Sequence, residues 1–387
     1  MRTNGPIAYI ALYAAMYAAF GVASPFWPKF FETKALSSPQ IGLILGAGML
    51  VRLAAAPLVG RLADASGSLR SVLAACAGLA ATMAAALLLT DSFWPLIVIA
   101  SLQAAALAPM TSIADALSVN SARPQLAGRP FEYGWIRGAG SAAFILGTLT
   151  IGQLISGADL DPIVWMNIAL LAAAAAATGL LPSADAAREP RKRSLPADEA
   201  LGLLWLPRFR NLLVVSALVY GSHAMHDAFA VIRWSDAGMA PSAISMLWSE
   251  AVAAEVIVFF LIGPWLLRRI GTRNAAAIAA VAGVIRWSVA GVTTSILPLA
   301  MVQPLHGLTF ALLHLACMRM MQTIVPVSLC ATAQGLYAFS AGVATATLTL
   351  LSGVLFARYG GLSFYPMAAL CGVAIPLAWL GLPDERK

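Results

Sequence analysis

Residues 39–67 read PQIGLILGAGMLVRLAAAPLVGRLADASG, a long apolar run followed by a short polar loop. The apolar part ends near Leu62 and is long enough to cross a membrane, because ~30 Å of hydrocarbon takes about 20 helical residues. The loop GRLADASG begins at Gly60. This stretch predicts a transmembrane helix that ends in a tight loop at the membrane surface.

The same pattern recurs through the chain. With 60% hydrophobic and only 11% charged residues, the protein has too little polar surface for a soluble globule of its length. Its mean hydropathy of +0.83 agrees. We therefore predict an all-α integral membrane protein with twelve transmembrane helices, at residues 6–31, 39–62, 69–89, 94–119, 133–155, 163–181, 212–234, 243–267, 274–295, 297–323, 330–356 and 362–380.

The spans fall into two groups of six. Between them, residues 183–208 are charged and contain three prolines, which break regular structure, as in a solvated linker. The loop at residues 60–67 has a counterpart at residues 264–271, with the terminal glycine in register. We predict two six-helix pseudo-repeats, residues 1–182 and 209–387, joined by a cytoplasmic linker.

Basic residues set the orientation. With both termini in the cytoplasm, sixteen of the 24 Lys and Arg lie in cytoplasmic segments and only four, Lys29, Lys34, Arg233 and Arg358, lie outside. This bias follows the positive-inside rule. The net charge of +7 then reflects topology and lipid contact, so nucleic acid is not an expected partner. We expect a multi-pass protein of the cell's inner (cytoplasmic) membrane.

The loop at residues 60–67 resembles the signature of the major facilitator superfamily, in which Gly60, Asp64 and Gly67 match the conserved spacing. The resemblance implies that Asp64 caps a neighbouring helix and closes the cytoplasmic side, a gating role that all three residues would share. Ala65 stands where that family has a basic residue.

Further stretches resemble lactose permease and, more closely, the phenylpropionate permease group. Residues 131–140 (FEYGWIRGAG) resemble the start of the fifth span in lactose permease, where the arginine holds substrate, which implies that role for Arg137. Residues 285–287 (IRW) and 303–310 (QPLHGLTF) match the phenylpropionate group. Thr309 stands where lactose permease has a carboxylate, so sugar transport by that relay is not implied.

Ionisable residues within the spans mark a pathway, since each costs about 2.5–3.5 kcal/mol or more at the bilayer centre. Asp115 and Arg137 lie equally far from the middle of the loop that joins their spans, and Glu255 and Arg286 do the same in the second half. We expect each acid to meet its arginine. The plainer alternative is that both pairs only fix helix register.

Both pairs suggest anion and proton coupling. A guanidinium binds a carboxylate in bidentate fashion, so Arg137 or Arg286 could exchange its internal acid for a substrate carboxylate. The released Asp115 or Glu255 would then take up a proton. His306 is a second candidate proton site, although a neutral imidazole that hydrogen bonds between helices is an equal alternative.

The remaining candidates have simpler interpretations. His223, His226 and Asp227 share a helix face, but without a matching ligand set we predict no metal site. The four cysteines show no paired spacing, which predicts neither a disulfide framework nor zinc. Tyr17 and Trp248 are candidate aromatic contacts for substrate, whereas most aromatic residues at helical spacing only pack.

We therefore expect a secondary transporter, and not an enzyme, that takes up a small organic anion with protons by alternating access. An aromatic carboxylate such as 3-phenylpropionate is the candidate substrate. The alternatives are a proton-driven exporter of a drug or metabolite, or a sugar or nucleoside symporter. A receptor is disfavoured because no large soluble domain exists, and no phosphate-loop motif indicates ATP hydrolysis.

The expected site has three parts. No cofactor is expected beyond protons as coupling ion, and the lipid bilayer is the expected partner of a monomer. The candidate residues are, for substrate, Arg137, Arg286, His306, Trp248 and Tyr17; for proton coupling, Asp115, Glu255, His306 and His223; and for gating, Gly60, Asp64 and Gly67.

Overall fold

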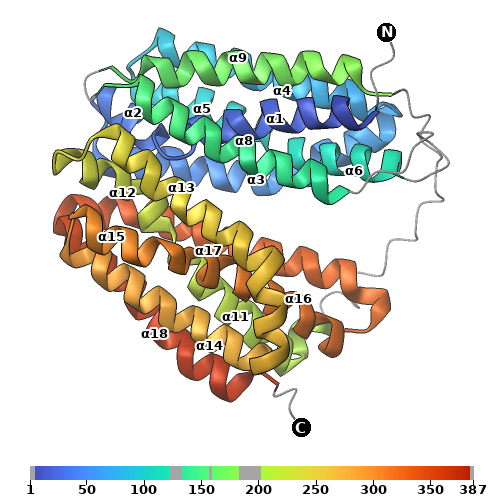
Figure 1. Cartoon of the computed structure of the whole chain (residues 1–387), viewed down its shortest axis with the longest axis vertical. Coiled ribbons are helices and arrows are strands. Elements are labelled where there is room, and N and C mark those ends of the chain that lie inside the picture. The colour runs from blue at the N-terminus through green and yellow to red at the C-terminus, as the bar shows by residue number, and fades with distance from the viewer. Residues whose placement is uncertain (1–4, 123–132, 157–158, 183–201, 384–387) are drawn as a thin grey trace. The chain divides into compact units, whose positions relative to one another are not determined.

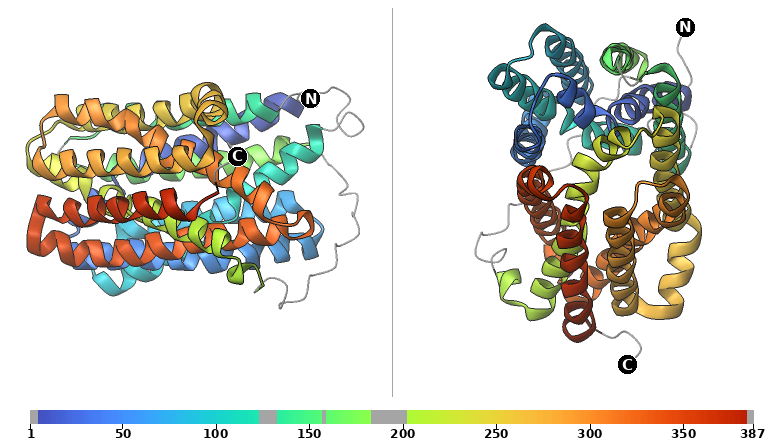
Figure 2. Two further views of the ribbon diagram at one scale, coloured as in Figure 1. Left: turned by 90° about the horizontal axis from the view of Figure 1, so that it is seen from below. Right: turned by 90° about the vertical axis from the view of Figure 1, so that its left-hand side faces the viewer.

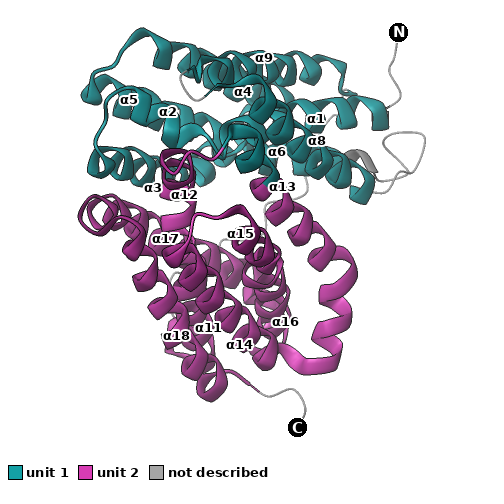
Figure 3. Cartoon of the chain, turned by 60° about the vertical axis from the view of Figure 1, so that its left-hand side comes forward, with its two compact units in different colours: residues 1–190, 240–246 teal, residues 191–239, 247–387 magenta. Residues whose placement is uncertain are grey.

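A computed structural model describes residues 5–122, 133–156, 159–182 and 202–383. The described residues form helices and turns and contain no strand (Figure 1). The chain divides into two compact units, drawn in different colours in Figure 3. Unit 1 comprises Met1–Pro190 with Ala240–Met246, and unit 2 comprises Arg191–Met239 with Leu247–Lys387. Most of the predicted linker, at 183–201, lies outside the described residues.

Unit 1 is a bundle whose long helices run side by side (Figure 2). Its helices are α1 (Gly5–Ala23), α2 (Trp27–Thr33), α3 (Ser38–Ser66), α4 (Leu69–Ala86), η1 (Leu87–Leu89), α5 (Phe93–Leu107), α6 (Met110–Ala122), α8 (Tyr133–Leu154), α9 (Asp161–Ala177) and η2 (Thr178–Leu180). Helix α1 packs along both α8 and α9, and α3 packs against α5. A core of buried residues from Ala8 to Leu181 lies among them.

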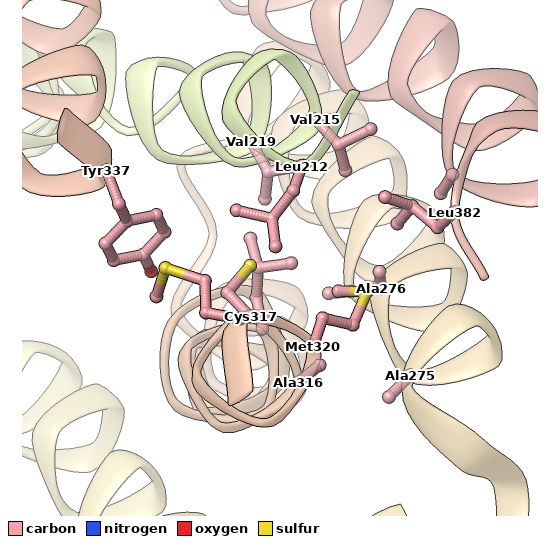
Figure 4. Packing of buried hydrophobic residues seen from close by; sticks show 14 of the residues in the cluster. Leu212, Val215, Val219, Ala275, Ala276, Ala316, Cys317, Met320, Tyr337 and Leu382 are labelled. Carbon is pink, nitrogen blue, oxygen red and sulfur yellow. The ribbon is translucent and has the colours of Figure 1, made fainter. Parts of the chain in front are cut away.

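Unit 2 is a second bundle. Its helix α13 begins within Ala240–Met246, the short segment that belongs to unit 1. Its helices are η3 (Leu203–Trp205), α11 (Pro207–Gly221), α12 (Ala224–Asp236), α13 (Pro241–Ile257), η4 (Val258–Ile262), α14 (Gly263–Val292), α15 (Ile296–Val302), η5 (Gln303–Leu305), η6 (Gly307–Leu312), α16 (Leu313–Ile324), η7 (Val327–Leu329), α17 (Cys330–Tyr359), η8 (Gly360–Ser363) and α18 (Phe364–Gly381). In its core, Val219 of α11, Ala276 of α14 and Cys317 of α16 face one another (Figure 4).

The predicted all-α membrane fold is confirmed, because each of the twelve predicted spans is helical. Among the described residues, eight helical segments are long and apolar enough to cross a membrane. Two of these, Pro241–Val292 and Val327–Gly381, each contain two predicted spans. The other two predicted spans correspond to α8 and to the pair α11 and α12. The chain is thus a multi-pass membrane protein.

Several spans are interrupted where the sequence weakens the helix. The first span does not run to Phe31 as predicted: α1 ends at Ala23 and α2 begins at Trp27. Pro25 and Pro28 account for this end, since proline lacks the N–H that a helix interior needs. Pro109 separates α5 from α6 for the same reason.

The seventh span breaks without a proline, between Gly221 and Ala224. At the break, side chains bond the backbone carbonyl of Val219. Ser222 Oγ and His223 Nδ1 lie 2.6 and 3.0 Å from its oxygen. Broken helices of this kind occur in transporters where backbone meets polar groups inside the protein. The break brings the His223 ring into the interior of unit 2, where it is 5% exposed.

The two related loops end in glycines with left-handed backbone. Gly67 has φ of 68° after α3, and Gly271 has φ of 77° inside α14, which is therefore two spans joined at that residue. Only glycine adopts this conformation without a steric penalty. The terminal glycine of the sequence echo is thus the residue that turns the chain between consecutive spans in both units.

Candidate functional site

Arg137 of α8 lies over the ring of Tyr17 of α1 in unit 1, with Cζ 5.0 Å from the ring centroid. Both side chains carry a buried polar atom, Arg137 Nη1 and Tyr17 Oη, that has no hydrogen-bond partner among the described residues. Buried donors are nearly always satisfied in proteins. Two neighbouring donors without partners are typical of a binding site for a hydrogen-bond acceptor.

Glycines on α8 let this contact form. A Cβ on Gly140 would lie 3.0 Å from the Tyr17 ring, and one on Gly147 would lie 2.6 Å from the carbonyl oxygen of Ala18. Without those side chains, α8 packs closely along α1, and Thr148 Oγ1 donates to the carbonyl of Gly21 at 2.8 Å. The position of Arg137 against Tyr17 is therefore built into the helix interface.

The expected ion pair between Asp115 and Arg137 is not formed. Asp115 Oδ1 instead accepts hydrogen bonds from the hydroxyls of Tyr13 and Tyr133, the latter at 2.8 Å. An equal distance from the joining loop does not bring Asp115 to Arg137, because α8 packs mainly along α1. Each expected partner contacts a tyrosine of α1 instead: Asp115 accepts a hydrogen bond from Tyr13, and Arg137 lies over the ring of Tyr17.

Arg286 of α14 is enclosed in unit 2, with 1% of its surface exposed. Its Nη1 lies 3.3 Å from His223 Nε2, 3.2 Å from His306 Nδ1 and 3.1 Å from Thr309 Oγ1. Its Nη2 donates to Gln303 Oε1 at 3.2 Å. These acceptors are neutral, and the guanidinium also stacks 4.5 Å from the Trp287 ring centroid.

Glu255 and Arg286 meet through His306. Glu255 Oε2 is 3.4 Å from His306 Nε2, on the opposite side of the ring from Arg286. A guanidinium only donates, so His306 Nδ1 is the acceptor, and Nε2–H then faces the carboxylate. The expected pair is thus a chain of cation, imidazole and anion. Glu255 and His306 keep 27% and 18% of their side-chain surface exposed.

His223 has both ring nitrogens occupied. Nδ1–H donates to the Val219 carbonyl, which leaves Nε2 as an acceptor beside Arg286 and beside Thr309 Oγ1 at 3.0 Å. Because both ring nitrogens already make hydrogen bonds, and Nε2 lies beside the Arg286 cation, His223 is better suited to hold Arg286 in place than to transfer protons. His223 was a candidate for proton coupling on the sequence, which does not show these bonds.

His226 lies among three tryptophans. It stacks on Trp248 with centroids 5.1 Å apart, and it contacts Trp234 and Trp287. Its Nδ1 is 3.2 Å from Asp227 Oδ1. Trp248, a candidate for substrate contact, is 8% exposed, and one of its faces is covered by this histidine.

The gating candidates lie together at the end of α3. Asp64 is exposed and makes no hydrogen bond or ion pair with any residue that the structure describes, and a Cβ on Gly60 or Gly67 would meet nothing within 4 Å. The helix-capping role of Asp64 therefore stays a prediction. Gly67 turns the chain, as its φ of 68° requires.

Sequence reasoning missed several polar contacts. Gln303 and Thr309, which bond Arg286, fall in the stretch QPLHGLTF, and their spacing around His306 was the available signal. The hydrogen bond of Tyr133 to Asp115 could not be predicted from the sequence, because it depends on how α6 and α8 approach each other. His314 bonds a tyrosine of α17, a contact that its spacing in the sequence does not show: its Nδ1 lies 3.3 Å from the hydroxyl of Tyr337.

Comparisons with known proteins agree with this architecture. A family model described as the MFS_1 like family matches residues 7–367. The chain is 31% identical to the probable 3-phenylpropionic acid transporter of Escherichia coli strain K12, over 95% of each sequence. It is 26% identical to the maltose permease of Geobacillus stearothermophilus, over 97% of this chain and 94% of the permease.

Solved structures show the same fold. The nucleoside transporter NupG superposes with a TM-score of 0.85 over 98% of each chain, at 19% identity. A bacterial homologue of the human lysosomal transporter Spinster gives a TM-score of 0.76 over 98% of this chain and 96% of the homologue, at 16% identity. At these identities the likeness concerns the fold alone.

Proposed function

Because the chain belongs to the MFS_1 like family and is a secondary transporter of the major facilitator fold, we propose that it takes up a small organic anion together with protons. The anion is an aromatic carboxylate of the size of 3-phenylpropionate. The 31% identity to a probable transporter of that acid supports the choice. Protons are the coupling ion, and no cofactor is involved.

The observation that carries this proposal is the pair of unsatisfied donors on Arg137 and Tyr17. A carboxylate has two oxygens, which accept one bond from a guanidinium and one from a phenol, and charge-assisted bonds of this kind are about twice as strong as neutral ones. The stacked rings of Tyr13 and Tyr17, with centroids 5.7 Å apart, and the edge contact of Tyr17 with Phe20 supply an aromatic surface beside the donors.

Coupling follows from the chain of Arg286, His306 and Glu255. Glu255 balances the charge of Arg286 through the imidazole. A substrate carboxylate on Arg137 brings a negative charge into the protein, and uptake of a proton by Glu255 offsets that charge. Substrate and proton are then carried together. Asp115, held by two tyrosine hydroxyls, is a second candidate that the same experiments test.

The membrane and the orientation complete the proposal. We place the protein in the inner membrane as a monomer, with both termini in the cytoplasm, on the bias of its basic residues. The substrate anion and proton enter together, so the pH gradient drives accumulation. Export would instead give extrusion against an imposed proton gradient.

The test is uptake of radiolabelled 3-phenylpropionate into proteoliposomes with and without an inward proton gradient. A panel of hexanoate, maltose and uridine extends it, and 3-phenylpropanamide serves as a competitor with the same ring but no carboxylate. We expect gradient-driven accumulation of the acid, competition by acids and none by the amide. Arg137→Gln should reduce uptake by about tenfold or more, since a charge-assisted hydrogen bond contributes ~1.5–3 kcal/mol.

Arg358→Gln is the matched control. Arg358 also lies over a tyrosine, 5.4 Å from the Tyr359 ring centroid, but it is exposed at the end of α17. Its variant should transport like the wild type. Accumulation of maltose with no movement of any acid would contradict the proposal and would agree with the similarity to the maltose permease.

A further inference from the structure

The helix that carries His306 and His314 contains a π-helical turn between them, η6 (Gly307–Leu312). Residues eight apart in a regular α-helix point about 80° from each other, because each residue turns the helix by about 100°. A π turn closes over one extra residue, which reduces the difference to about 20°. The π turn therefore brings both histidines to one face of the helix.

That face is directed at α13, where Glu255 lies. The π turn η4, which follows Glu255 in the chain, packs against η6, and a Cβ on Gly307 would lie 2.7 Å from the carbonyl oxygen of Ala254. Glu255 contacts His306 directly, and His314 follows on the same helix face eight residues later, about 12 Å along the axis. The carboxylate therefore lies against the helix face that carries both histidines.

Hydrogen bonds fix the tautomer of His314. Tyr220 donates to the Phe310 carbonyl at 3.3 Å, and Tyr337 donates to the Tyr220 hydroxyl at 2.9 Å. With its hydrogen used in this way, the Tyr337 oxygen can only accept at 3.3 Å from His314, so Nδ1 carries the hydrogen. His314 Nε2 is left with a free lone pair, which is the atom that can receive a proton.

From this arrangement we infer that His314 receives the proton of Glu255 through an intervening water and passes it to water at the side where α16 ends, with Tyr337 and Tyr220 as positioning residues. The inference rests on the proposed proton-coupled transport. His314 lies ten residues before the end of α16 at Ile324, about 15 Å along the helix, and its side chain is partly exposed. In the predicted orientation that end faces the cytoplasm.

The proton balance is closed at each step. Protonated Glu255 gives its proton to the intervening water, which gives one to His314 Nε2, and Glu255 becomes the carboxylate that His306 faces in the structure. His314 becomes an imidazolium whose Nδ1–H remains on Tyr337, and it then loses the Nε2 proton to water. The titratable groups around His314 are Glu255 on α13, Tyr337 on α17, Tyr220 on α11 and Cys317 on α16.

Two transport modes separate this role from a structural one. Exchange of labelled for unlabelled 3-phenylpropionate at equal pH needs no release of the proton, whereas accumulation driven by a pH gradient needs it in every cycle. We expect His314→Gln to keep exchange near the wild-type rate and to lower gradient-driven accumulation by about tenfold or more, the size of effect that loss of a proton-transfer group produces. Proton entry, followed with a pH dye inside the vesicles, should fall in parallel.

Tyr337→Phe is the second variant, since it removes the acceptor that fixes the His314 tautomer. It should keep exchange, lower accumulation less than His314→Gln, and shift the pH profile of accumulation. Tyr359→Phe, at an exposed tyrosine on the same helix, is its control. If His314→Gln loses both exchange and accumulation, the Tyr337→Phe variant decides between the two roles. The inference holds if Tyr337→Phe lowers accumulation and keeps exchange, and any other result for Tyr337→Phe overturns it.

The outcomes also separate this inference from the proposed function. Wild-type protein that neither exchanges nor accumulates any acid removes the proposed function and the inference with it. Wild-type accumulation that His314→Gln matches, with equal proton entry, overturns the inference alone and leaves anion and proton uptake intact.

Discussion

The three tyrosines along one side of α1 differ in what their hydroxyls bond. Tyr9 donates to the carbonyl of Leu117 at 3.0 Å, and Tyr13 donates to Asp115. The hydroxyl of Tyr17 is buried and has no partner among the described residues. At the residue scale, the first two hydroxyls stabilise the contact of α1 with α6, and the third is available to a ligand.

Tyr17→Phe is therefore expected to leave the thermal stability unchanged or slightly raised, because it removes a buried group that has no bond. It should raise the KM for 3-phenylpropionate about tenfold, the effect of one lost hydrogen bond to a charged group at ~1.5 kcal/mol. Tyr9→Phe is the matched control and should lower stability while KM stays the same. A Tyr17→Phe protein that melts lower and keeps its KM would contradict a substrate role.

At the scale of elements, two π turns lie next to Glu255 and His306, the residues proposed for proton coupling. Glu255 precedes η4 by three residues, and His306 directly precedes η6. Their close packing depends on Gly307, where a Cβ would lie 2.7 Å both from the carbonyl oxygen of Ala254 and from Val258 Cγ2. Neither neighbour is the end of a flexible chain, so the helices themselves must shift to admit a methyl group.

Gly307→Ala should separate η6 from η4, lengthen the contact of Glu255 with His306, and destabilise the protein by about 1–3 kcal/mol, as overpacking does. The measurements are thermal unfolding in detergent and gradient-driven accumulation, both of which should fall. Gly335→Ala is the control in another helix of unit 2, since its Cβ would meet nothing within 4 Å. Equal stability of the two variants would show that the packing of the π turns does not depend on this glycine.

At the scale of the whole molecule, charge determines how the chain lies in the membrane. Arg61 and Arg70 flank the turn between α3 and α4, and Arg268, Arg269 and Arg273 flank Gly271 in α14. The turn at residues 237–240 carries no basic residue. Short loops with an excess of Lys and Arg stay in the cytoplasm. The direction proposed for proton release depends on this orientation, since the end of α16 must face the cytoplasm.

A cysteine-labelling experiment tests the orientation. In a protein whose native cysteines are replaced by alanine, Ala65→Cys should react with a membrane-impermeant maleimide only after cells are opened, and Ala237→Cys should react in intact cells. Both positions are exposed, so accessibility within the protein does not limit the reaction. The reverse pattern of labelling would invert the topology and the direction of proton release.

Much of the fold could be read from the sequence, and less of the site. The apolar period of about 20 residues marks every span because hydrocarbon thickness sets helix length. The same pattern does not show where a span breaks without a proline, as at Ser222 and His223, since that break depends on side chains that satisfy freed carbonyls. It also does not show π turns, which add one residue to the helix register.

The sequence by itself determined the number of spans, their division into two groups of six and the identity of the charged residues within them. These follow from solvation, because a residue's preference for lipid or water is a property of its own side chain. Only the tertiary structure decided which groups meet: Asp115 with two tyrosines, Arg137 with Tyr17, and Glu255 with Arg286 through His306. A contact depends on which helices are neighbours and on rotations of a few tens of degrees, and spacing along a single helix does not fix either.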